Sequence, residues 1–177
     1  MRGGSGVLLV TAVVAAGQMM AAGQAGTLPA VDIKAAEIAA MAGPEHKQGT
    51  LPNIRVVDAG KHNIAVGALY RTAAQPQPVA VHYKVSEIYY VLKGSATLVT
   101  GGKVVNAKVR AADSAQVKAQ DGPGESGTAI EGGVSREIHE GDVIVIPAGT
   151  PHWFSKIDQA LGYMVIRVDP ERILDLK

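Results

Sequence analysis

The 177-residue sequence contains no cysteine, which excludes disulfide bonds, a thiolate nucleophile and any zinc or iron–sulfur site built on cysteine. A bound metal would therefore be held by histidine, aspartate or glutamate side chains. The sequence also lacks an excess of one charge, because its formal net charge is +1 at pH 7 and no long basic or acidic run occurs. A surface that binds nucleic acid or an anionic membrane is therefore not expected.

The composition is that of a folded domain. Hydrophobic residues make up 47% of the sequence and charged residues 19%, which is apolar enough to bury a core and too apolar for a disordered chain. The length suits one domain with at most a terminal appendage.

The first 25 residues have the pattern of a secretory signal peptide. Arg2 is the only charge before Asp32, and residues 7–16 (VLLVTAVVAA) form a compact apolar run. Small residues follow, and those at 23 and 25 offer a cleavage site. The run is shorter than the roughly 20 apolar residues that a membrane span needs, although a short hydrophobic helix or an anchor is the alternative. We expect cleavage after Ala25 and a periplasmic or secreted mature protein without a membrane segment. An intact N-terminus on the mature protein, measured by mass spectrometry, would contradict this.

The rest of the sequence predicts a short helical segment followed by strands. Residues 26–53 are expected to form a helix over Val31–Met41 and a linker. Over residues 54–177, short β-rich runs with glycine and proline turns predict an all-β sandwich or small barrel. Residues 107–133 are polar and rich in glycine and alanine, and they predict an inserted surface loop in which one or two weak strands remain open. Loops of this length in compact domains are often functional.

Two stretches carry side chains suited to metal chemistry. In residues 82–87 (HYKVSE), His82 ends one predicted strand and Glu87 begins the next, so a hairpin can bring both side chains to one face of a sheet. In residues 141–152 (GDVIVIPAGTPH), a buried strand runs into a proline–glycine turn that presents His152. Two imidazoles and one carboxylate suffice for a divalent metal, and with open positions they suit Fe(II). Taken singly, the first pair reads as a surface cross-strand pair and the last histidine as a loop residue.

Together these stretches resemble the two sequence motifs of the cupin superfamily. The first motif is matched at its second histidine (His82), its glutamate (Glu87) and its closing glycine (Gly94). The matches to the second motif, through its histidine, are Gly141, Pro147, Gly149 and His152. The sequence departs from the motifs at three positions. In the first motif, Pro76 replaces the opening glycine and Ala80 replaces the first histidine; in the second motif, Lys156 replaces the asparagine.

The resemblance covers about residues 57–168 and implies a cupin-type β-barrel, that is, a jelly-roll-like double-stranded β-sandwich. It also implies a mononuclear metal on His82, Glu87 and His152. Full cupin sites use three imidazoles and one carboxylate, and Ala80 takes the place of the missing imidazole. The result is either a site with more open positions or a barrel that no longer holds metal. The implied cofactor is a divalent metal, Fe(II) first, with Zn, Mn, Ni or Cu as alternatives.

Aromatic residues are few, but five of the seven lie beside the proposed ligands. By strand parity, Tyr89 and Phe154 should point inward with Glu87 and His152. An inward Tyr89 could hydrogen-bond a ligand, or it could pack in the core with its hydroxyl satisfied. Tyr89 and Glu87 are our candidate catalytic residues.

The resemblance implies an exported, metal-dependent enzyme, in its most concrete form a dioxygenase-like oxidoreductase acting on a small organic molecule. Isomerase or lyase chemistry, or a non-catalytic barrel that binds a small ligand or a metal, is the alternative, because the fold alone does not decide activity. Arg71, beside a proline loop, could bind a carboxylate or pair with an acid.

Residues 88–92 and 143–146 are apolar on both faces of their strands. Strands of this kind must be covered on both sides. The cover is either the N-terminal segment or a second copy of the chain, and a homodimer is our hypothesis.

Overall fold

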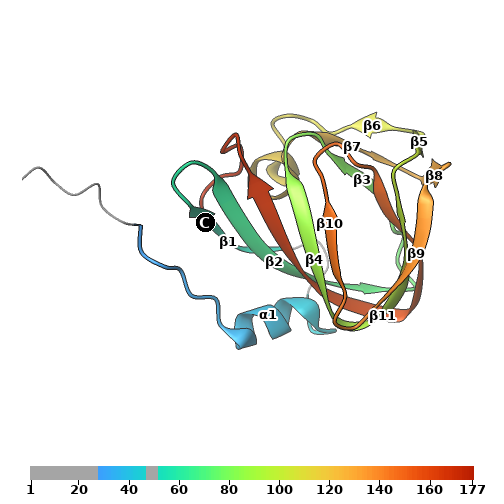
Figure 1. Cartoon of the computed structure of the whole chain (residues 1–177), viewed down its shortest axis with the longest axis horizontal. Coiled ribbons are helices and arrows are strands. Elements are labelled where there is room, and N and C mark those ends of the chain that lie inside the picture. The colour runs from blue at the N-terminus through green and yellow to red at the C-terminus, as the bar shows by residue number, and fades with distance from the viewer. Residues whose placement is uncertain (1–27, 47–51) are drawn as a thin grey trace, which may run out of the picture.

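The computed structural model describes residues 28–46 and 52–177, which form a barrel of antiparallel strands with one short helix outside it (Figure 1). The proposed signal segment at 1–25 lies outside the described residues, so export stays a prediction. None of the helices in the described ranges has the length and apolar character that a membrane crossing would require. The elements in chain order are α1 (Ala35–Ala42), β1 (Asn53–Asp58), β2 (Asn63–Thr72), β3 (Val79–His82), β4 (Ser86–Thr100), β5 (Lys103–Val105), β6 (Lys108–Val109), the π-helix η1 (Val117–Asp121), β7 (Gly124–Gly127), β8 (Ala129–Glu131), β9 (Val134–His139), β10 (Val143–Ile146) and β11 (His152–Asp169).

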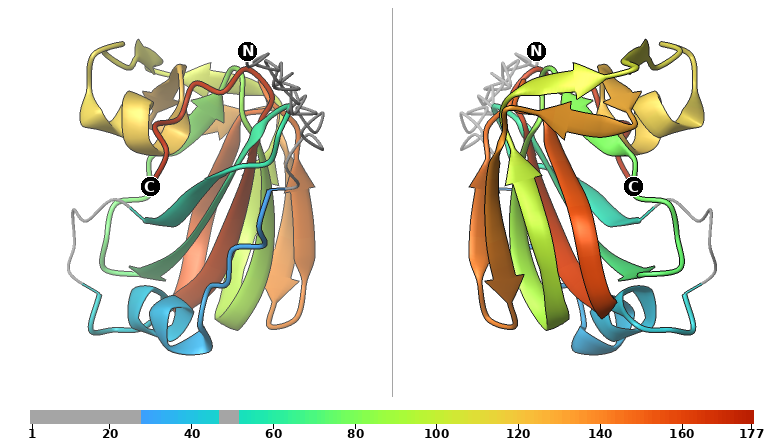
Figure 2. Two further views of the ribbon diagram at one scale, coloured as in Figure 1. Left: turned by 90° about the vertical axis from the view of Figure 1, so that its left-hand side faces the viewer. Right: turned by 90° about the vertical axis from the view of Figure 1, so that its right-hand side faces the viewer.

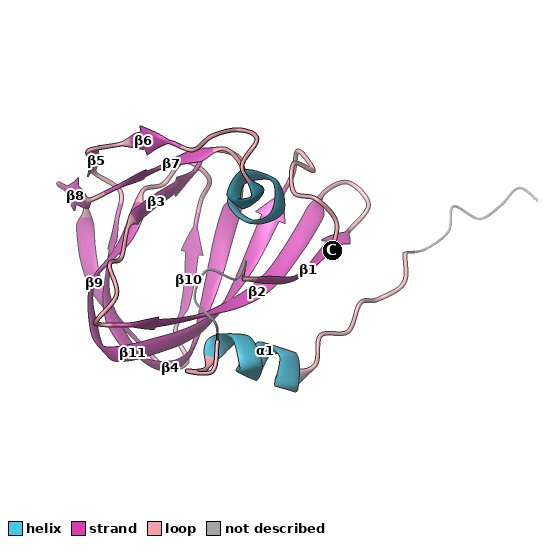
Figure 3. Ribbon diagram, turned by 180° about the vertical axis from the view of Figure 1, so that it is seen from behind, coloured by secondary structure: helices cyan, strands magenta, loops and turns pink. Residues whose placement is uncertain are grey.

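Strand β11 connects the two sides of the barrel. Its later part pairs with β2, nearly its whole length pairs with β4, and His152 at its start pairs with Ala80 of β3. The main sheet runs in the order β1-β2-β11-β3-β7-β6, and β4 also pairs with β9 and β10. Strands β5 and β8 form a separate two-stranded sheet. The strands curve around one interior (Figures 2 and 3), which confirms the all-β barrel predicted from the sequence.

Alternation along β4 places the site residues inside the barrel. Glu87, Tyr89 and Val91 are 1%, 5% and 0% exposed, whereas Tyr90 between them is 40% exposed. Because successive side chains of a strand point to opposite faces, this side of β4 faces the interior. Phe154 of β11 is buried in the same core, so the inward direction predicted for Tyr89 and Phe154 is confirmed.

Gly94 shows why the first motif ends in a glycine. It adopts φ +87° within β4, opposite Leu161, where the register between β4 and β11 shifts. A Cβ at this position would collide with the backbone carbonyl of Ala160. Glycine therefore permits the irregular crossing of the two longest strands.

Residues 107–133 differ from the predicted surface loop. The segment contains β6, η1, β7 and β8, and β7 pairs with β3, so it belongs to the main sheet. Figure 3 shows η1 at the same end of the barrel as β3 and β7. Asp121 of η1 is only 4% exposed. Short strands were left open in the prediction, but the pairing of β7 with β3 was not predicted, because a polar, glycine-rich composition does not reveal pairing with a strand some 45 residues earlier.

The helix lies on the outer surface of the barrel. α1 begins at Ala35, four residues later than predicted, and packs against β2 and β11. Glu37 accepts hydrogen bonds from the Lys34 backbone N–H at 3.1 Å and from Arg55 Nη2 at 2.8 Å, which ties the helix to β1. The apolar core of the barrel comprises Tyr89, Val91, Ala96, Leu98, Ile138, Ile144, Ile146, Phe154, Ile157, Leu161, Tyr163 and Val165.

Candidate metal centre

Three buried side chains from three different strands converge inside the barrel. His82 ends β3, Glu87 follows in β4, and His152 begins β11. The Nε2 atoms of His82 and His152 lie 3.4 Å and 3.2 Å from Glu87 Oε2. One ligand atom from each residue lies within 4.8 Å of the others. The structure thus brings together all three residues that the sequence predicted as metal ligands.

Both imidazoles are oriented by backbone carbonyl groups. His82 Nδ1 lies 3.0 Å from the carbonyl oxygen of Asp121, and His152 Nδ1 lies 3.0 Å from that of Thr150. A carbonyl oxygen can only accept a hydrogen bond, so Nδ1 carries the proton in each ring. In the neutral imidazoles the Nε2 lone pairs then point to the centre of the site, which is the usual arrangement for metal-binding histidines.

The donor set fits a divalent cation. Two Nε2 lone pairs and an anionic carboxylate oxygen face one another in a buried space, where they repel unless a proton or a cation lies between them. Two nitrogen ligands and one oxygen ligand are the set that non-haem iron and related divalent metals accept. The backbone bonds at Nδ1 supply the outer support that such sites need.

Glu87 is held ionised by its neighbours. Arg167 Nε donates to Glu87 Oε1 at 2.8 Å, and the Tyr89 hydroxyl donates to Glu87 Oε2 at 2.8 Å. Burial alone would raise the pKa of the Glu87 carboxyl, but the positive charge of neighbouring groups, Arg167 among them, holds that pKa well below its usual value. The carboxylate is therefore available as an anionic ligand at neutral pH.

Tyr89 points into the site, with its hydroxyl already engaged. Burial, reinforced by the negative charge of Glu87, raises the pKa of Tyr89 well above its ordinary value. Its ring lies edge-on to His152, with centroids 6.1 Å apart, and tilted against Tyr163 at 4.8 Å. Of the two roles considered from the sequence, the structure shows core packing with the hydroxyl satisfied by Glu87, and Tyr89 also lines the cavity described below.

The sequence did not predict the buried charged network that lies behind the ligands. Arg167 donates to Asn53 Oδ1 at 2.6 Å and pairs with Asp121 at 3.4 Å, and Arg110 Nε lies 4.0 Å from Asp121. A signal for Arg167 was present, since it is the only charged residue in the apolar strand 161–168. No pattern in the neighbouring sequence predicts that Asp121 is buried near the ligands, because its position depends on the path of residues 107–133.

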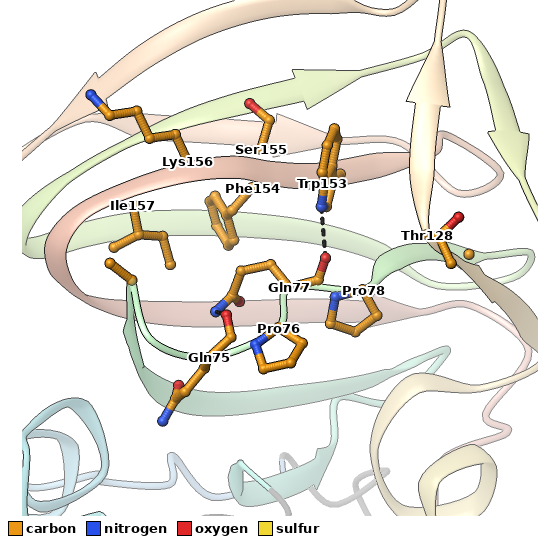
Figure 4. A pocket seen from close by; sticks show the side chains of 12 residues that line it. Gln75, Pro76, Gln77, Pro78, Thr128, Trp153, Phe154, Ser155, Lys156 and Ile157 are labelled. Carbon is orange, nitrogen blue, oxygen red and sulfur yellow. Dashed lines mark hydrogen bonds between the residues drawn. The ribbon is translucent and has the colours of Figure 1, made fainter.

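The ligands line a small cavity of about 90 Å³. Ala80 also lines this cavity, so the missing imidazole leaves space beside His152. A larger outer groove of about 580 Å³ adjoins it, and Figure 4 shows Pro76 and Pro78 facing Trp153 and Phe154 across this groove. The residues that line both spaces are Gln77, Pro78, Trp153 and Phe154. The groove is therefore the natural approach to the cavity.

Comparison with protein families gives a match over most of the barrel. The family model described as Cupin matches residues 64–173, which is more than half of the chain and includes all three candidate ligands. No curated protein sequence matches the chain.

Similar solved structures share little sequence with the chain. BH2720 from Bacillus halodurans is 15% identical, with a TM-score of 0.42 over 72% of this chain and 76% of that chain. An RmlC-like cupin family protein with a double-stranded β-helix fold from Methanocaldococcus jannaschii is 12% identical, with a TM-score of 0.41 over 71% and 88%. The DMSP lyase DddQ from Ruegeria pomeroyi DSS-3 is 21% identical, with a TM-score of 0.38 over 59% and 37%. Likeness at these levels carries no argument about activity.

Proposed function

The chain belongs to the cupin family, and on this premise we propose that it is a metal-dependent enzyme with one divalent metal on His82, Glu87 and His152. The reaction we propose is a dioxygenase-like oxidation of a small organic molecule, with Fe(II) as the first choice of metal and Zn, Mn, Ni or Cu as alternatives. The observation that carries the proposal is the convergence of two Nε2 lone pairs on the carboxylate of Glu87. A bound divalent metal supplies Lewis acidity, and iron also supplies redox chemistry.

The residues of the chain prepare this site. The carbonyls of Asp121 and Thr150 hold both imidazoles in one tautomer. Arg167 neutralises Glu87 from behind and keeps its Oε1 directed away from the histidines. The three ligand residues are 4%, 1% and 5% exposed in the order of the sequence, and this burial keeps bulk water from the ligands. Ala80 leaves room for a substrate beside His152.

We assign Tyr89 a positioning role for Glu87. Its raised pKa keeps the hydroxyl protonated at neutral pH, and the proton is directed at Glu87 Oε2. Tyr89 therefore fixes which lone pair of Glu87 faces the histidines. Glu87 itself acts as a ligand, because both of its oxygens are engaged and neither is free to accept a substrate proton.

A non-catalytic binding barrel is the second candidate. It is favoured by the engagement of both cavity carboxylates, since Glu87 is bound by Arg167 and Tyr89, and Asp121 by Gln116 and Arg167. No unpaired carboxylate among the described residues lining the cavity is then available as a general base. Isomerase or lyase chemistry needs such a base or a metal-activated water, so it remains tied to metal binding.

Metal analysis of the purified protein tests the proposal. We expect about one divalent metal per chain, lost in His82→Ala and His152→Ala and retained in His139→Ala, whose exposed side chain lies on β9. Wild-type protein without bound metal after loading under anaerobic conditions would overturn the proposal. With metal bound, oxygen consumption on a panel of small organic molecules separates the oxidoreductase from the binding protein.

We also propose a homodimer, built on the outer face of β10. Val143 and Val145 are 63% and 66% exposed, and their partners across the pairing with β4 are Tyr90 and Ile88. This apolar strip is of the kind that marks an interface. Within the described residues α1 packs against β2 and β11 instead, so a second copy is the occupant to which we commit.

A further inference from the structure

The cavity is lined by more cations than anions. Three guanidinium groups line it, from Arg71, Arg110 and Arg167, and only two carboxylates, from Glu87 and Asp121. A divalent metal on the candidate ligands would add further positive charge. Because an uncompensated charge is costly away from bulk water, the natural occupant of the remaining space is an anion.

The excess cation is Arg71. Arg167 pairs with Glu87 and with Asp121, and Arg110 lies near Asp121. Arg71, at the end of β2, has no carboxylate within ion-pair distance among the described residues. Its Nε donates to the Tyr163 hydroxyl at 3.0 Å and its Nη1 to Gln77 Oε1 at 3.0 Å. A guanidinium is always charged and has five donor protons. Besides these two neutral partners, Arg71 has no acceptor for its Nη2 protons among the described residues.

Tyr163 provides a second donor beside Arg71. Its oxygen accepts from Arg71, so its own proton is free to be donated, and no acceptor for it is present in the described part of the chain. Tyr163 is 2% exposed, and a buried hydroxyl of this kind normally finds an acceptor. Both residues line the same cavity as the metal ligands. Arg71 Nη2 and the Tyr163 hydroxyl thus form a pair of unused donors.

We propose that the substrate or ligand of this cavity is a small carboxylate, whose anionic group is bound by Arg71 and Tyr163. The inference rests on the proposed function in one respect, since it is the metal at the other end of the cavity that would act on the bound molecule. Charge-assisted hydrogen bonds to a planar guanidinium are the usual means of orienting a carboxylate. The cavity of about 90 Å³ restricts the ligand to a few heavy atoms, well below the roughly 300–1,000 Å³ of pockets for drug-sized molecules.

Two residues of the segment 75–78, Gln77 and Pro78, line both the outer groove and the cavity. Gln77 accepts from Arg71 through its side chain, and its backbone carbonyl accepts from Trp153 Nε1 at 2.6 Å (Figure 4). Gln77 thus lies between the outer groove and the guanidinium. A carboxylate arriving through the groove replaces a neutral amide acceptor on Arg71 with a charged one, which is the stronger interaction.

The test compares matched pairs of acids and amides as probes. Four pairs are titrated into the metal-free and the metal-loaded protein: acetate and acetamide, glycolate and glycolamide, pyruvate and pyruvamide, and malonate and malonamide. Binding is measured by calorimetry and by the shift in melting temperature, at constant ionic strength. We expect at least one acid to bind about tenfold more tightly than its amide, as the loss of a charge-assisted hydrogen bond implies.

Variants assign the effect to Arg71. In Arg71→Gln we expect the preference for the acid to fall by about tenfold or more, while metal content stays at the wild-type level. Arg71→Lys keeps the charge and should retain part of the preference, so the pair remains informative if the neutral variant folds poorly. Arg136→Gln, which removes an exposed guanidinium bonded to Thr100 Oγ1, is the control and should change nothing.

Two results would overturn the inference. One is a panel in which no acid is preferred over its amide by the wild-type protein, which needs no variant. The other is an acid preference that survives in Arg71→Gln but disappears with the metal, which would mean that the anion binds at the metal alone. Failure of the proposed function looks different, because the protein would then hold no metal while still preferring the acid in its metal-free form.

Discussion

The Nδ1–H of His82 donates a hydrogen bond to the backbone carbonyl oxygen of Asp121, 39 residues further along the chain, at 3.0 Å. A metal ligand on β3 is thus oriented by η1, the π-helix of the segment that follows β6. Partners of this kind in the outer shell of a metal set the tautomer and the direction of the ring. Metal affinity should therefore depend on residues 107–133, although none of them is a ligand.

Gly122→Ala tests this dependence. Gly122 follows Asp121 with φ +66° and ψ −176°, a conformation that favours glycine, and a Cβ would lie 3.0 Å from Val85 Cγ2. Displacement of the Asp121 carbonyl should weaken metal binding by about tenfold or more, measured by competition with a chelator. Gly101→Ala is the control, with φ +75° but open space around the added Cβ. Equal affinity in both variants would contradict the role of the segment.

Glu87→Gln should lower the stability of the metal-free protein. It leaves the buried guanidinium of Arg167 without its closest anion, and breaking such a pair costs about 3–5 kcal/mol. Chemical denaturation measures this loss. The control is Glu137→Gln, whose side chain is exposed on β9, and a similar loss in both variants would argue against the ion pair.

The lowered pKa of Glu87 also predicts that the stability of the fold depends on pH. The folded pKa of Glu87 lies well below its ordinary value of 4.5, so its charge stabilises the fold fully above about pH 4.5 and less as the pH falls through the lowered pKa. The stability of the wild-type protein should therefore approach that of Glu87→Gln on acidification. A difference between the two proteins that stays constant down to strongly acidic pH would contradict the lowered pKa.

Ala80→His should add a nitrogen ligand. Ala80 lines the cavity and its backbone pairs with His152, so an imidazole on this face can reach the metal. We expect metal affinity to rise by about one order of magnitude, with loss of the open side of the site and hence of any activity. Chelator competition and turnover are the two measurements. Unchanged affinity would mean that the space beside His152 does not belong to the metal site.

Tyr89→Phe should cost stability without loss of metal. The variant removes the hydroxyl that donates to buried Glu87 Oε2, which is worth about 1.5–3 kcal/mol for a bond to a charged group. Tyr83→Phe makes the same chemical change at an exposed carboxylate, that of Glu125, and should have little effect. Loss of the metal from Tyr89→Phe would show that Tyr89 has more than a positioning role.

Val145→Lys should produce a monomer. Val145 is 66% exposed at the centre of the apolar strip on β10, and a lysine there would place a charge in the proposed interface. Light scattering at a fixed concentration gives the oligomeric state. Val109→Lys, at a 73% exposed valine on β6, is the control and should leave the dimer intact. A monomeric wild-type protein would contradict the homodimer.

Local patterns in the sequence predicted most of the strands and the faces of the site residues, and the resemblance to the cupin motifs selected the three candidate ligands. Period-two alternation placed Glu87 and Tyr89 on one face of β4, and the turns before β4 and β11 placed His82 and His152 at strand ends. These inferences succeed because each concerns residues close in the chain, whose relative directions follow from backbone geometry. The segment 107–133 escaped the same reasoning, since β7 has a polar sequence and is a strand only through its pairing with β3.

The sequence by itself determined an all-β domain, which follows from side-chain periodicity and turn chemistry. It also identified the histidine and carboxylate residues of the candidate site, through the cupin motifs that they resemble. Only the tertiary structure decided what surrounds that site: Arg167 behind Glu87, the Asp121 carbonyl on His82, and Arg71 without an acid partner. The first two contacts join residues that are 80 and 39 positions apart in the sequence. The third depends on the absence of a carboxylate near Arg71 among the described residues. Closure of the barrel brings them together, and no local signal encodes which distant strand will face which.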